Sequence, residues 1–320
     1  MKKFILSALA AASICAAQAQ SNTLSLSQQG DGNSAPVTQR GNGNVGAITV
    51  AGDNNYTSFE QLGNSLTGTI SIAGSRNRAF SQADHYLNET TITQMGNDNS
   101  GIVLTTYRSD HNQVTLNQAG DGNSGYVYAT DHSDDNHIGV NQSGNSNTAE
   151  AYSAYHSTHN SINISQSGDG NTGTAYTYNS DRNQISLTQA GDRNTGLAIA
   201  ASSDRNQIDL AQNGDNNIGL ITANDGSYNQ GHISQTGSDN NAQLSQVGYL
   251  NTSSVVQDGD NNTLTDLERD PNVRYRTRYF GAVQQGYGNS FALTQAGDGN
   301  TLHFGQTGNN NTATVSQRPN

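Results

Sequence analysis

The 320-residue chain is poor in both charged residues (12%) and apolar residues (32%). Apart from Lys2 and Lys3 its basic residues are 12 arginines, set against 26 acidic residues, which gives the remainder a formal charge of −14. This charge argues against binding to nucleic acid or to an anionic membrane. A conventional globular core is also excluded, because such a core needs about 45–50% apolar residues.

Residues 1–19 have the features of a secretory signal peptide. A basic start is followed by an apolar stretch at 4–12 and by Ala-Gln-Ala at 17–19, which is a small-x-small cleavage site. The apolar stretch is too short to cross a bilayer, and no later segment is apolar enough to form an integral membrane span. Cys15 is the only cysteine, so the cleaved chain would have no thiol. The sequence therefore predicts export.

Residues 20–262 repeat the motif Gln-x-Gly-x-x-Asn, which occurs intact 14 times in the whole chain. The Asn position recurs 24 times, mostly every 11 to 13 residues, and only Leu66 departs from Asn. The second and fourth residues after each Asn are apolar or small, the sixth is usually Gln, and the residues between them are polar. This alternation is typical of a strand. The Gly supplies the positive φ of a turn, and we expect the Asn to tolerate a positive φ as well.

The repeat predicts an all-β fold, a β-solenoid of about twelve two-stranded coils of 22–25 residues each. A strand of about five residues buries too little surface to stand alone, so two strand-turn units form one coil that stacks on the next. At roughly 4.8 Å per coil the stack would be about 55–60 Å long. In the middle of the chain bulky inward residues of one strand face small residues of its partner, such as Gly125 and Ala149.

The inward Gln and Asn side chains are predicted to form ladders of amide hydrogen bonds along the stack, each amide bonding to its neighbours above and below. The predicted self-assembly ladder consists of Gln94, Gln118, Gln142, Gln166, Gln189, Gln212, Gln235, Asn99, Asn123, Asn147, Asn171, Asn194 and Asn217. The predicted turn glycines are Gly96, Gly120, Gly144, Gly168, Gly191 and Gly214. In the second half of the coils the Gln position is predicted to be taken by Tyr107, Asp131, Tyr155, Tyr178, Ala201 and Asn224.

Two further features concern the surface of the solenoid. Tyr128, Tyr152 and Tyr176 recur every 24 residues and should stack on one outer face. We favour a tyrosine ladder that stabilises the strands, and a functional aromatic strip is the alternative. Aspartates at the turn tips, as in Asp121-Gly122 and Asp169-Gly170, would place like charges in every coil and so moderate assembly, unless they act only as turn formers.

Residues 263–279 are predicted to be an irregular insertion, after which residues 280–320 form the terminal coils. The interval from Asn262 to Asn289 is 27 residues, and Pro271 suits a protruding loop. The insertion contains Arg269, Arg274, Arg276 and Arg278 beside two tyrosines. We favour a tolerated insertion, and a docking loop for an acidic surface or partner is the alternative.

No metal, cofactor or catalytic site is expected. The segment 131–137 and the pair His156 and His159 contain metal-binding residue types, but they fall where exposed turn residues recur. Ser, His and Asp are present without a unique context that would assemble a triad, so we do not expect an enzyme.

The repeated unit resembles the curlin repeat of curli fibre subunits. Residues 184–196, QISLTQAGDRNTG, stand where the family motif would, and residues 201–206 form a degenerate second half. The resemblance covers residues 21–320 except the insertion. It implies a secreted subunit that polymerises into extracellular amyloid fibres on the bacterial surface, for biofilm matrix and adhesion. It also implies a nucleator subunit and an outer-membrane secretion pore as partners.

Three classes of function remain open at this point. The first, which we favour, is a structural fibre subunit, either major or of the nucleator type. The second is a monomeric solenoid that binds a surface such as ice or carbohydrate, although the outward residues at Thr115, Gly139 and Asn163 are mixed. The third is an enzyme on a solenoid scaffold, for which no cleft cluster is evident. Because Val37 and Val315 fit the core pattern at the two ends, with no capping element, we expect growth by end-to-end stacking.

Overall fold

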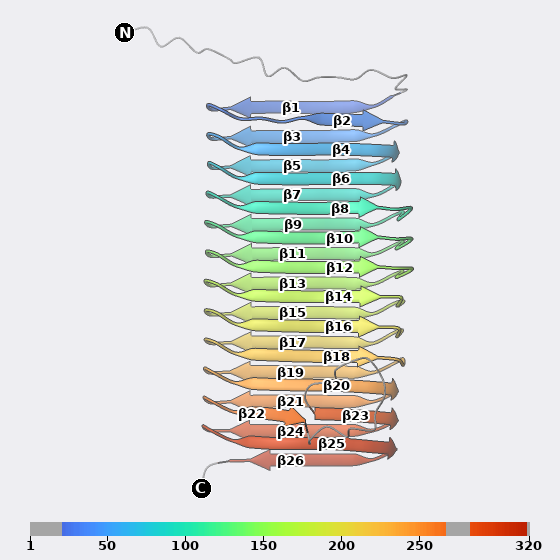
Figure 1. Ribbon diagram of the computed structural model, residues 1–320, viewed down its shortest axis with the longest axis vertical. Helices are drawn as coiled ribbons and strands as arrows, with labels where there is room; N and C mark the ends of the chain where they lie inside the picture. Colours follow the sequence, from blue (N-terminus) through green and yellow to red (C-terminus); the bar gives the residue numbers. More distant parts are fainter. Residues whose placement is uncertain (1–20, 267–281, 319–320) are drawn as a thin grey trace, which may run out of the picture.

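The computed structural model describes residues 21–266 and 282–318. The signal peptide expected at 1–19 and the four arginines of the expected docking loop lie outside the described residues. Within the described part of the chain every secondary-structure element is a β-strand. The strands form two sheets, each of parallel strands that are stacked along the long axis of the molecule (Figure 1). The prediction of an all-β solenoid of about twelve coils is confirmed.

Each sheet has thirteen strands. Sheet A consists of β1 (Thr23–Gln29), β3 (Val45–Ala51), β5 (Thr67–Ala73), β7 (Glu89–Met95), β9 (Gln113–Ala119), β11 (His137–Ser143), β13 (Ser161–Ser167), β15 (Gln184–Ala190), β17 (Gln207–Asn213), β19 (Gln230–Thr236), β21 (Thr252–Asp258), β24 (Ser290–Ala296) and β26 (Thr312–Gln317). Sheet B consists of β2 (Val37–Arg40), β4 (Tyr56–Asn64), β6 (Arg78–Tyr86), β8 (Ser100–Thr106), β10 (Ser124–Thr130), β12 (Thr148–Ala154), β14 (Thr172–Tyr178), β16 (Thr195–Ala201), β18 (Ile218–Asn224), β20 (Asn241–Tyr249), β22 (Thr263–Asp266), β25 (Thr301–Asn309) and β23 (Ala282–Tyr287).

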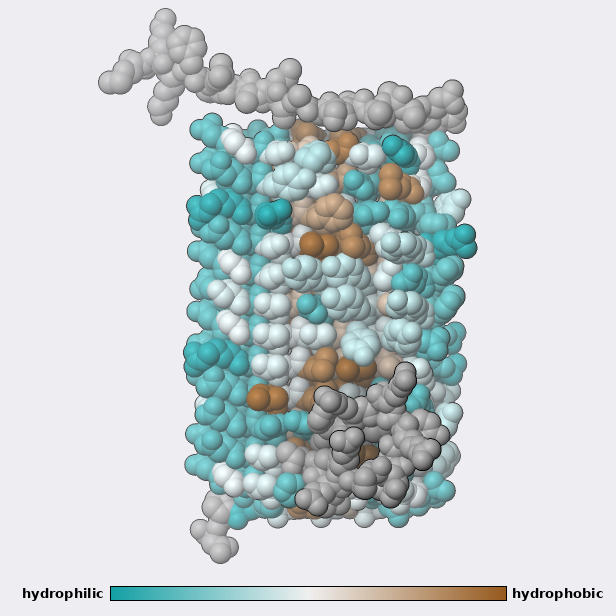
Figure 2. Space-filling view, viewed as in Figure 1, coloured by the Kyte–Doolittle hydropathy of each residue, from teal (hydrophilic) through white to brown (hydrophobic). Residues whose placement is uncertain are grey.

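The chain alternates between the sheets, so each coil contains one strand of sheet A, an A-to-B turn, one strand of sheet B and a B-to-A turn. Equivalent repeat positions pair directly in the next coil: Ile138 lies beside Ile162, and Gln142 lies beside Gln166. The apolar and amide positions therefore form columns that run along the stack. Hydrophilic side chains gather along both edges of the stack, where the turns lie (Figure 2).

The core is a thin layer between the sheets, bulky on one side and small on the other. Ile138 and Val140 of sheet A are fully buried, as the alternation predicted. On the facing strand β10, a Cβ built on Gly125 would lie 2.5 Å from Leu116 Cδ1. The leucine side chain therefore fills the space that the glycine leaves, which explains the pairing of bulky and small residues.

The predicted occupants of the second Gln position are wrong. In sheet B the residues in register with Gln61 and Gln246 are Ala83, Thr105, Ala129, Ser153, Thr177, Ala200 and Ala223. Tyr107, Asp131, Tyr155, Tyr178, Ala201 and Asn224 lie instead at the ends of these strands or in the turns that follow. The extra residues of the 12- and 13-residue intervals lengthen the turn, so a count backwards from the Asn overshoots the strand.

The recurring Asn does not adopt a positive φ, so the expectation that both the Gly and the Asn of the turn have this conformation is wrong for the Asn. In every described repeat the residue just before the Asn has the positive φ, for example Asp98 (57°), Ser146 (56°) and Arg193 (56°). The Asn thus acts through its side chain rather than through an unusual backbone conformation.

The insertion interrupts a single strand position of sheet B. Strands β22 and β23 both lie between β20 and β25: Leu264 pairs with Ala242, and Ala282 pairs with Leu244. Thr263–Asp266 therefore belong to the sheet, although they were expected within the insertion. β22 pairs with β25 as far as Asp266, which lies beside Phe304, and β23 pairs with the same strand from Val283, which lies beside Gly305.

The turn glycines allow a direct test of the stacking. Gly144 has φ +106°, and a Cβ there would lie 2.1 Å from the carbonyl oxygen of Gly168 in the next coil. We expect Gly144→Ala to lower the free energy of unfolding by about 1–3 kcal/mol from backbone strain alone, and by more because the coils must separate. At Gly139, on the outer face of sheet A, the nearest atom to a Cβ is 3.4 Å away.

The matched control Gly139→Ala should therefore change stability by about 0.5 kcal/mol or less. Denaturant unfolding followed by circular dichroism measures both variants. Equal losses at the two positions would contradict the stacked-turn geometry.

Candidate functional site

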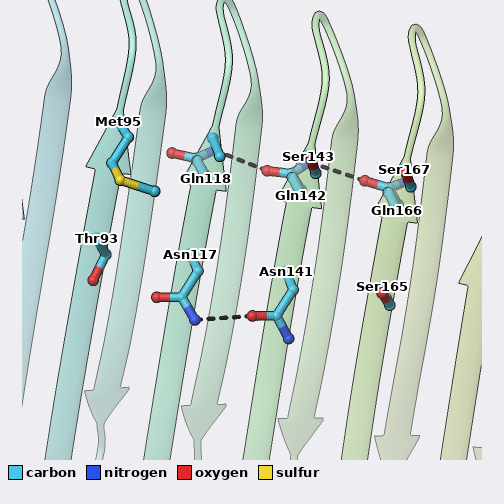
Figure 3. Close-up of a pocket in the computed structure, with 11 residues that line it drawn as sticks. Thr93, Met95, Asn117, Gln118, Asn141, Gln142, Ser143, Ser165, Gln166 and Ser167 are labelled. Atoms are coloured by element: carbon cyan, nitrogen blue, oxygen red, sulfur yellow. Dashed lines mark hydrogen bonds between the residues drawn. The ribbon is translucent and has the colours of Figure 1, made fainter. Parts of the chain in front are cut away.

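A line of buried glutamine side chains runs along sheet A. The Nε2 of each glutamine donates to the Oε1 of the glutamine in the next coil, at 2.8 Å from Gln94 to Gln118. The next two bonds are 2.9 Å from Gln118 to Gln142 and 3.0 Å from Gln142 to Gln166 (Figure 3). The line continues through Gln189, Gln212, Gln235, Gln257, Gln295 and Gln317. The structure thus brings all seven predicted ladder glutamines together.

Each glutamine of the ladder also bonds to the sheet B strand that precedes it in the chain. The Nε2 of Gln166 donates to the carbonyl oxygen of Thr148 at 2.9 Å, which links sheet A to sheet B across the core. Gln166 is 1% exposed, so its amide has little water to bond with. Since one side chain bonds to the coil before it, to the coil after it and to the opposite sheet, its removal would leave several buried groups without partners.

The glutamine ladder begins at β7 for a local reason. The residue in register with Gln94 in the preceding coil is Ile72, which has no amide. The Oε1 of Gln94 accordingly has no hydrogen-bond donor. A ladder of this kind is therefore continuous only where successive coils carry Gln at the same position.

An asparagine ladder runs through the A-to-B turns. The backbone N–H of Asn123 donates to the Oδ1 of Asn99 at 3.0 Å, and the Nδ2 of Asn123 donates to the carbonyl oxygen of Gly144 at 2.8 Å. The same backbone-to-Oδ1 bonds join Asn147, Asn171, Asn194 and Asn217 in turn. All six predicted asparagines are fully buried. The side chain of each one satisfies backbone groups of the next coil, and its backbone N–H donates to the asparagine of the coil before, so the ladder fixes the spacing of the coils.

The predicted turn glycines supply the acceptors of this ladder. Gly96, Gly120, Gly144, Gly168, Gly191 and Gly214 all have positive φ, between 103° and 123°. A Cβ at any of them would lie between 2.1 and 2.3 Å from the next glycine's carbonyl oxygen. These glycines are needed for both the turn and the close approach of the coils.

Sequence reasoning missed a second asparagine ladder in the B-to-A turns. It contains Asn88, Asn112, Asn136, Asn160, Asn183, Asn206 and Asn229. Here Asn136 donates from Nδ2 to the carbonyl oxygen of Ser157 at 2.7 Å, so a serine replaces the glycine. These asparagines are among the 24 recurring Asn positions of the sequence, but the predicted ladder included only those of the A-to-B turns.

The turn tips form a polar ladder of their own. The Oδ1 of Asp169 accepts the backbone N–H of Asn145 at 2.7 Å, and the Oδ1 of Asp192 accepts that of Asp169 at 2.8 Å. One coil spacing also separates Arg76 from Asp98, which form an ion pair at 2.6 Å. The hydrogen bond from Arg76 lowers the pKa of the Asp98 carboxyl. The tip carboxylates are thus backbone acceptors as well as surface charges.

The described residues offer little for catalysis. A shallow groove on the outer face of sheet A is lined mainly by small polar side chains, where Asn117 donates to Asn141 at 2.8 Å (Figure 3). No group of three or more His, Cys, Asp or Glu residues in the described ranges is arranged to hold a metal ion. His156 stacks on His132 with ring centroids 4.9 Å apart, and His159 lies 3.6 Å from Asp135.

The ladder predicts different outcomes for two neighbouring residues. Gln166 lies inward in the ladder, and Ser165 lies on the outer face of the same strand. We expect Gln166→Ala to cost about 1–3 kcal/mol of stability because it leaves buried amide and carbonyl groups unpaired. Ser165→Ala should cost about 0.5 kcal/mol or less. The denaturant midpoints of the two variants measure these costs. Equal shifts would mean that the amides do not stabilise the stack.

Comparison with known families supports the repeat assignment. Residues 237–265 match the family model of the curlin associated repeat. This range contains Gln246, which takes part in a short glutamine ladder in sheet B, and Gln257 of the long ladder in sheet A. The sequence matches no curated protein. Among the described residues there is also no helix long and apolar enough to cross a membrane.

Proposed function

We propose that this curlin-repeat protein is a structural subunit, without catalytic activity, that assembles with copies of itself into an extracellular curli-like fibre. The observation that carries the proposal is the set of amide ladders along the stack: asparagines join successive coils from Asn33 onwards, and glutamines join them from Gln94 onwards. A hydrogen-bond pattern that repeats with the coil can be extended by any coil with the same residues at the same positions.

The outermost described strands leave sheet edges to which such a coil could add. Within the described residues β1 and β26 each pair with one neighbour only. Apolar side chains at both ends pack against the core but remain partly exposed, among them Leu26 and Val37 at one end and Phe304 and Val315 at the other. Covering them with a further coil would stabilise assembly through burial of apolar surface.

The ladder also gives the stack a direction. Each glutamine of the long ladder from Gln94 to Gln295 donates towards the C-terminal end, and each from Gln118 to Gln317 accepts from the N-terminal side. Gln317, in the last strand of sheet A, accepts from Gln295, so a glutamine added beside it would continue the same donor direction. The buried alternation fixes the register of the added strand, because a slip by one residue would turn the amides outward. The two ends are thus chemically different, and growth at them should proceed at different rates.

The finer parts of the proposal follow from the sequence and the family. The predicted signal peptide would direct the chain out of the cell, and an outer-membrane secretion pore and a nucleator subunit would be its partners. The fibres would contribute to biofilm matrix and surface adhesion. The chain would serve either as the major fibre subunit or as a nucleator-type minor subunit. The insertion would be one that the stack tolerates, and a docking loop for an acidic partner is the alternative role of its arginines.

Thioflavin T fluorescence of purified residues 20–320 at micromolar concentration tests the proposal. We expect a lag followed by growth, and we expect a globular domain fused to one terminus to slow elongation by blocking one end. A chain that stays monomeric indefinitely under native conditions would overturn the proposal. Elongation at an unchanged rate in the fusion would count against end-on growth.

The aspartates at the turn tips should tune this assembly. In the combined variant Asp121→Asn, Asp169→Asn and Asp192→Asn, each residue keeps the Oδ1 acceptor and loses its negative charge. We expect a shorter lag phase at low ionic strength because repulsion between stacked charges is removed, and we expect the difference to shrink near 1 M salt, where charges are screened within about 3 Å. Unchanged lag times at low salt would leave these aspartates as turn formers only.

A further inference from the structure

The outer faces of the two sheets differ in character. The outward positions of sheet A carry small or polar residues such as Thr115, Gly139 and Asn163. Sheet B carries two adjacent columns of large apolar and aromatic side chains, all of them half-buried, which we call the apolar strip. It consists of Phe80, Ile102, Leu104, Tyr126, Tyr128, Tyr152, Tyr176, Leu197, Ile199 and Leu220. Figure 2 shows brown and pale side chains along the middle of the visible face, between two teal edges.

Two tyrosines at the centre of the strip cover each other's ring faces. The rings of Tyr128 and Tyr152 lie 4.9 Å apart with an interplanar angle of 12°. The ring of Tyr126 is nearly parallel to that of Tyr128, with centroids 6.5 Å apart. The centre of the strip therefore presents ring edges and hydroxyl groups to a partner. A sugar ring that needs an open aromatic face to stack on is therefore a poor fit to this surface.

Charge points to a second copy of the same chain as the partner. Between Phe80 and Leu220 the two columns contain one charged residue, Glu150. The chain as a whole is strongly acidic, and the tips of the A-to-B turns carry a series of aspartates. Two copies that meet on their apolar strips would keep these acidic edges apart, so like-charge repulsion is least in this arrangement.

The size of the strip indicates when the contact forms. It crosses seven strands of sheet B, from β6 to β18, which is about 30 Å at the usual strand spacing, and two columns of side chains are about 14 Å wide. Two strips would then bury on the order of 800 Å² in total, less than the roughly 1,000 Å² that a specific stable complex needs. One pair of monomers would bind weakly, whereas fibres would add one contact for each subunit.

We propose that the apolar strip of sheet B is a lateral self-association surface, which joins fibres of this chain face to face and which Glu150 weakens. This inference rests on the proposed fibre function. Facing sheets pack about 10 Å apart with interdigitated side chains. The Glu150 carboxylate has only the neutral hydroxyl of Tyr152 as a side-chain partner, so in that layer it would lose its water without gaining an opposite charge. Removal of the charge should strengthen the contact, and removal of the rings should weaken it.

Two sedimentation speeds separate the lateral contact from fibre growth. High-speed centrifugation pellets all fibres, and low-speed centrifugation pellets only bundles. We compare the wild-type chain with Glu150→Gln and with the combined variant Tyr128→Ser, Tyr152→Ser and Tyr176→Ser. The matched control carries Thr115→Ser, Asn163→Ser and Thr188→Ser on the outer face of sheet A.

All four proteins should give equal high-speed pellets. We expect the low-speed fraction to fall several-fold in the tyrosine variant, to rise in Glu150→Gln and to stay unchanged in the sheet A control. An unchanged low-speed fraction in both strip variants, or an equal loss in the control, overturns the lateral surface. Circular dichroism of each variant verifies its strand content, and Glu150→Gln keeps the test valid if the tyrosine variant misfolds.

Absence of a high-speed pellet from the wild-type chain would refute the fibre function instead. In that case the strip is tested in the soluble protein by analytical ultracentrifugation at high concentration. A weak dimer that Glu150→Gln strengthens supports the surface, and equal dimer fractions in the wild-type chain and the tyrosine variant overturn it.

Discussion

The inward glutamine amide is the group on which the rest of the structure depends. In a chain with so little apolar surface, a buried primary amide is stable only if both its hydrogens and its oxygen have partners. Gln166 finds those partners in Gln142, Gln189 and Thr148, that is, in the coil before it, in the coil after it and across the core. The amide therefore dictates the spacing of the coils, the distance between the sheets and the register of the strands.

The difference between the sheets follows from the same requirement. From β7 onwards an extended glutamine and a branched aliphatic residue on each strand of sheet A fill much of the space between the sheets, and the facing positions of sheet B from β10 to β16 are mostly small. Gly125 lies against Leu116, and Ala129 or Ser153 stands where a second glutamine would otherwise point inward. Near both ends sheet B carries glutamines again, and these form short ladders from Gln39 to Gln61 and from Gln246 to Gln306.

Strand pairing and the inward columns could be predicted from the sequence because both are strictly periodic. The alternation around Ile138 and Gln142 defines a buried face without any knowledge of tertiary structure, and the recurring Asn defines the coil. The predictions failed where the period varies. Tyr107 and Asp131 were placed by counting back from the next Asn, whereas the two extra residues of those intervals extend the turn. The split of one strand into β22 and β23 could not be predicted, since only the neighbouring strands reveal that Leu264 and Ala282 share a strand position.

The Asn ladders were foreseen in part for a related reason. Sequence periodicity shows that a side chain recurs, but it does not show whether the residue serves through its φ angle or through its amide. The role of Asn123 becomes clear only in the structure, where its backbone N–H bonds to the coil before it and its Nδ2 bonds to the coil after it. The positive φ belongs to Gly122, and a glycine, a serine or an arginine fills that position equally well elsewhere in the stack.

The split strand has a consequence for chain connectivity. β20 and β25 hold the two fragments β22 and β23 in line, although the polypeptide is not continuous through that position. The order of the coil is thus imposed by the layers on either side of it rather than by the covalent path within it. In such a stack a foreign segment can be spliced into the middle of a strand while the layers above and below keep their alignment. This position of sheet B is consequently a natural graft point, which the proposed fibre would repeat once per subunit.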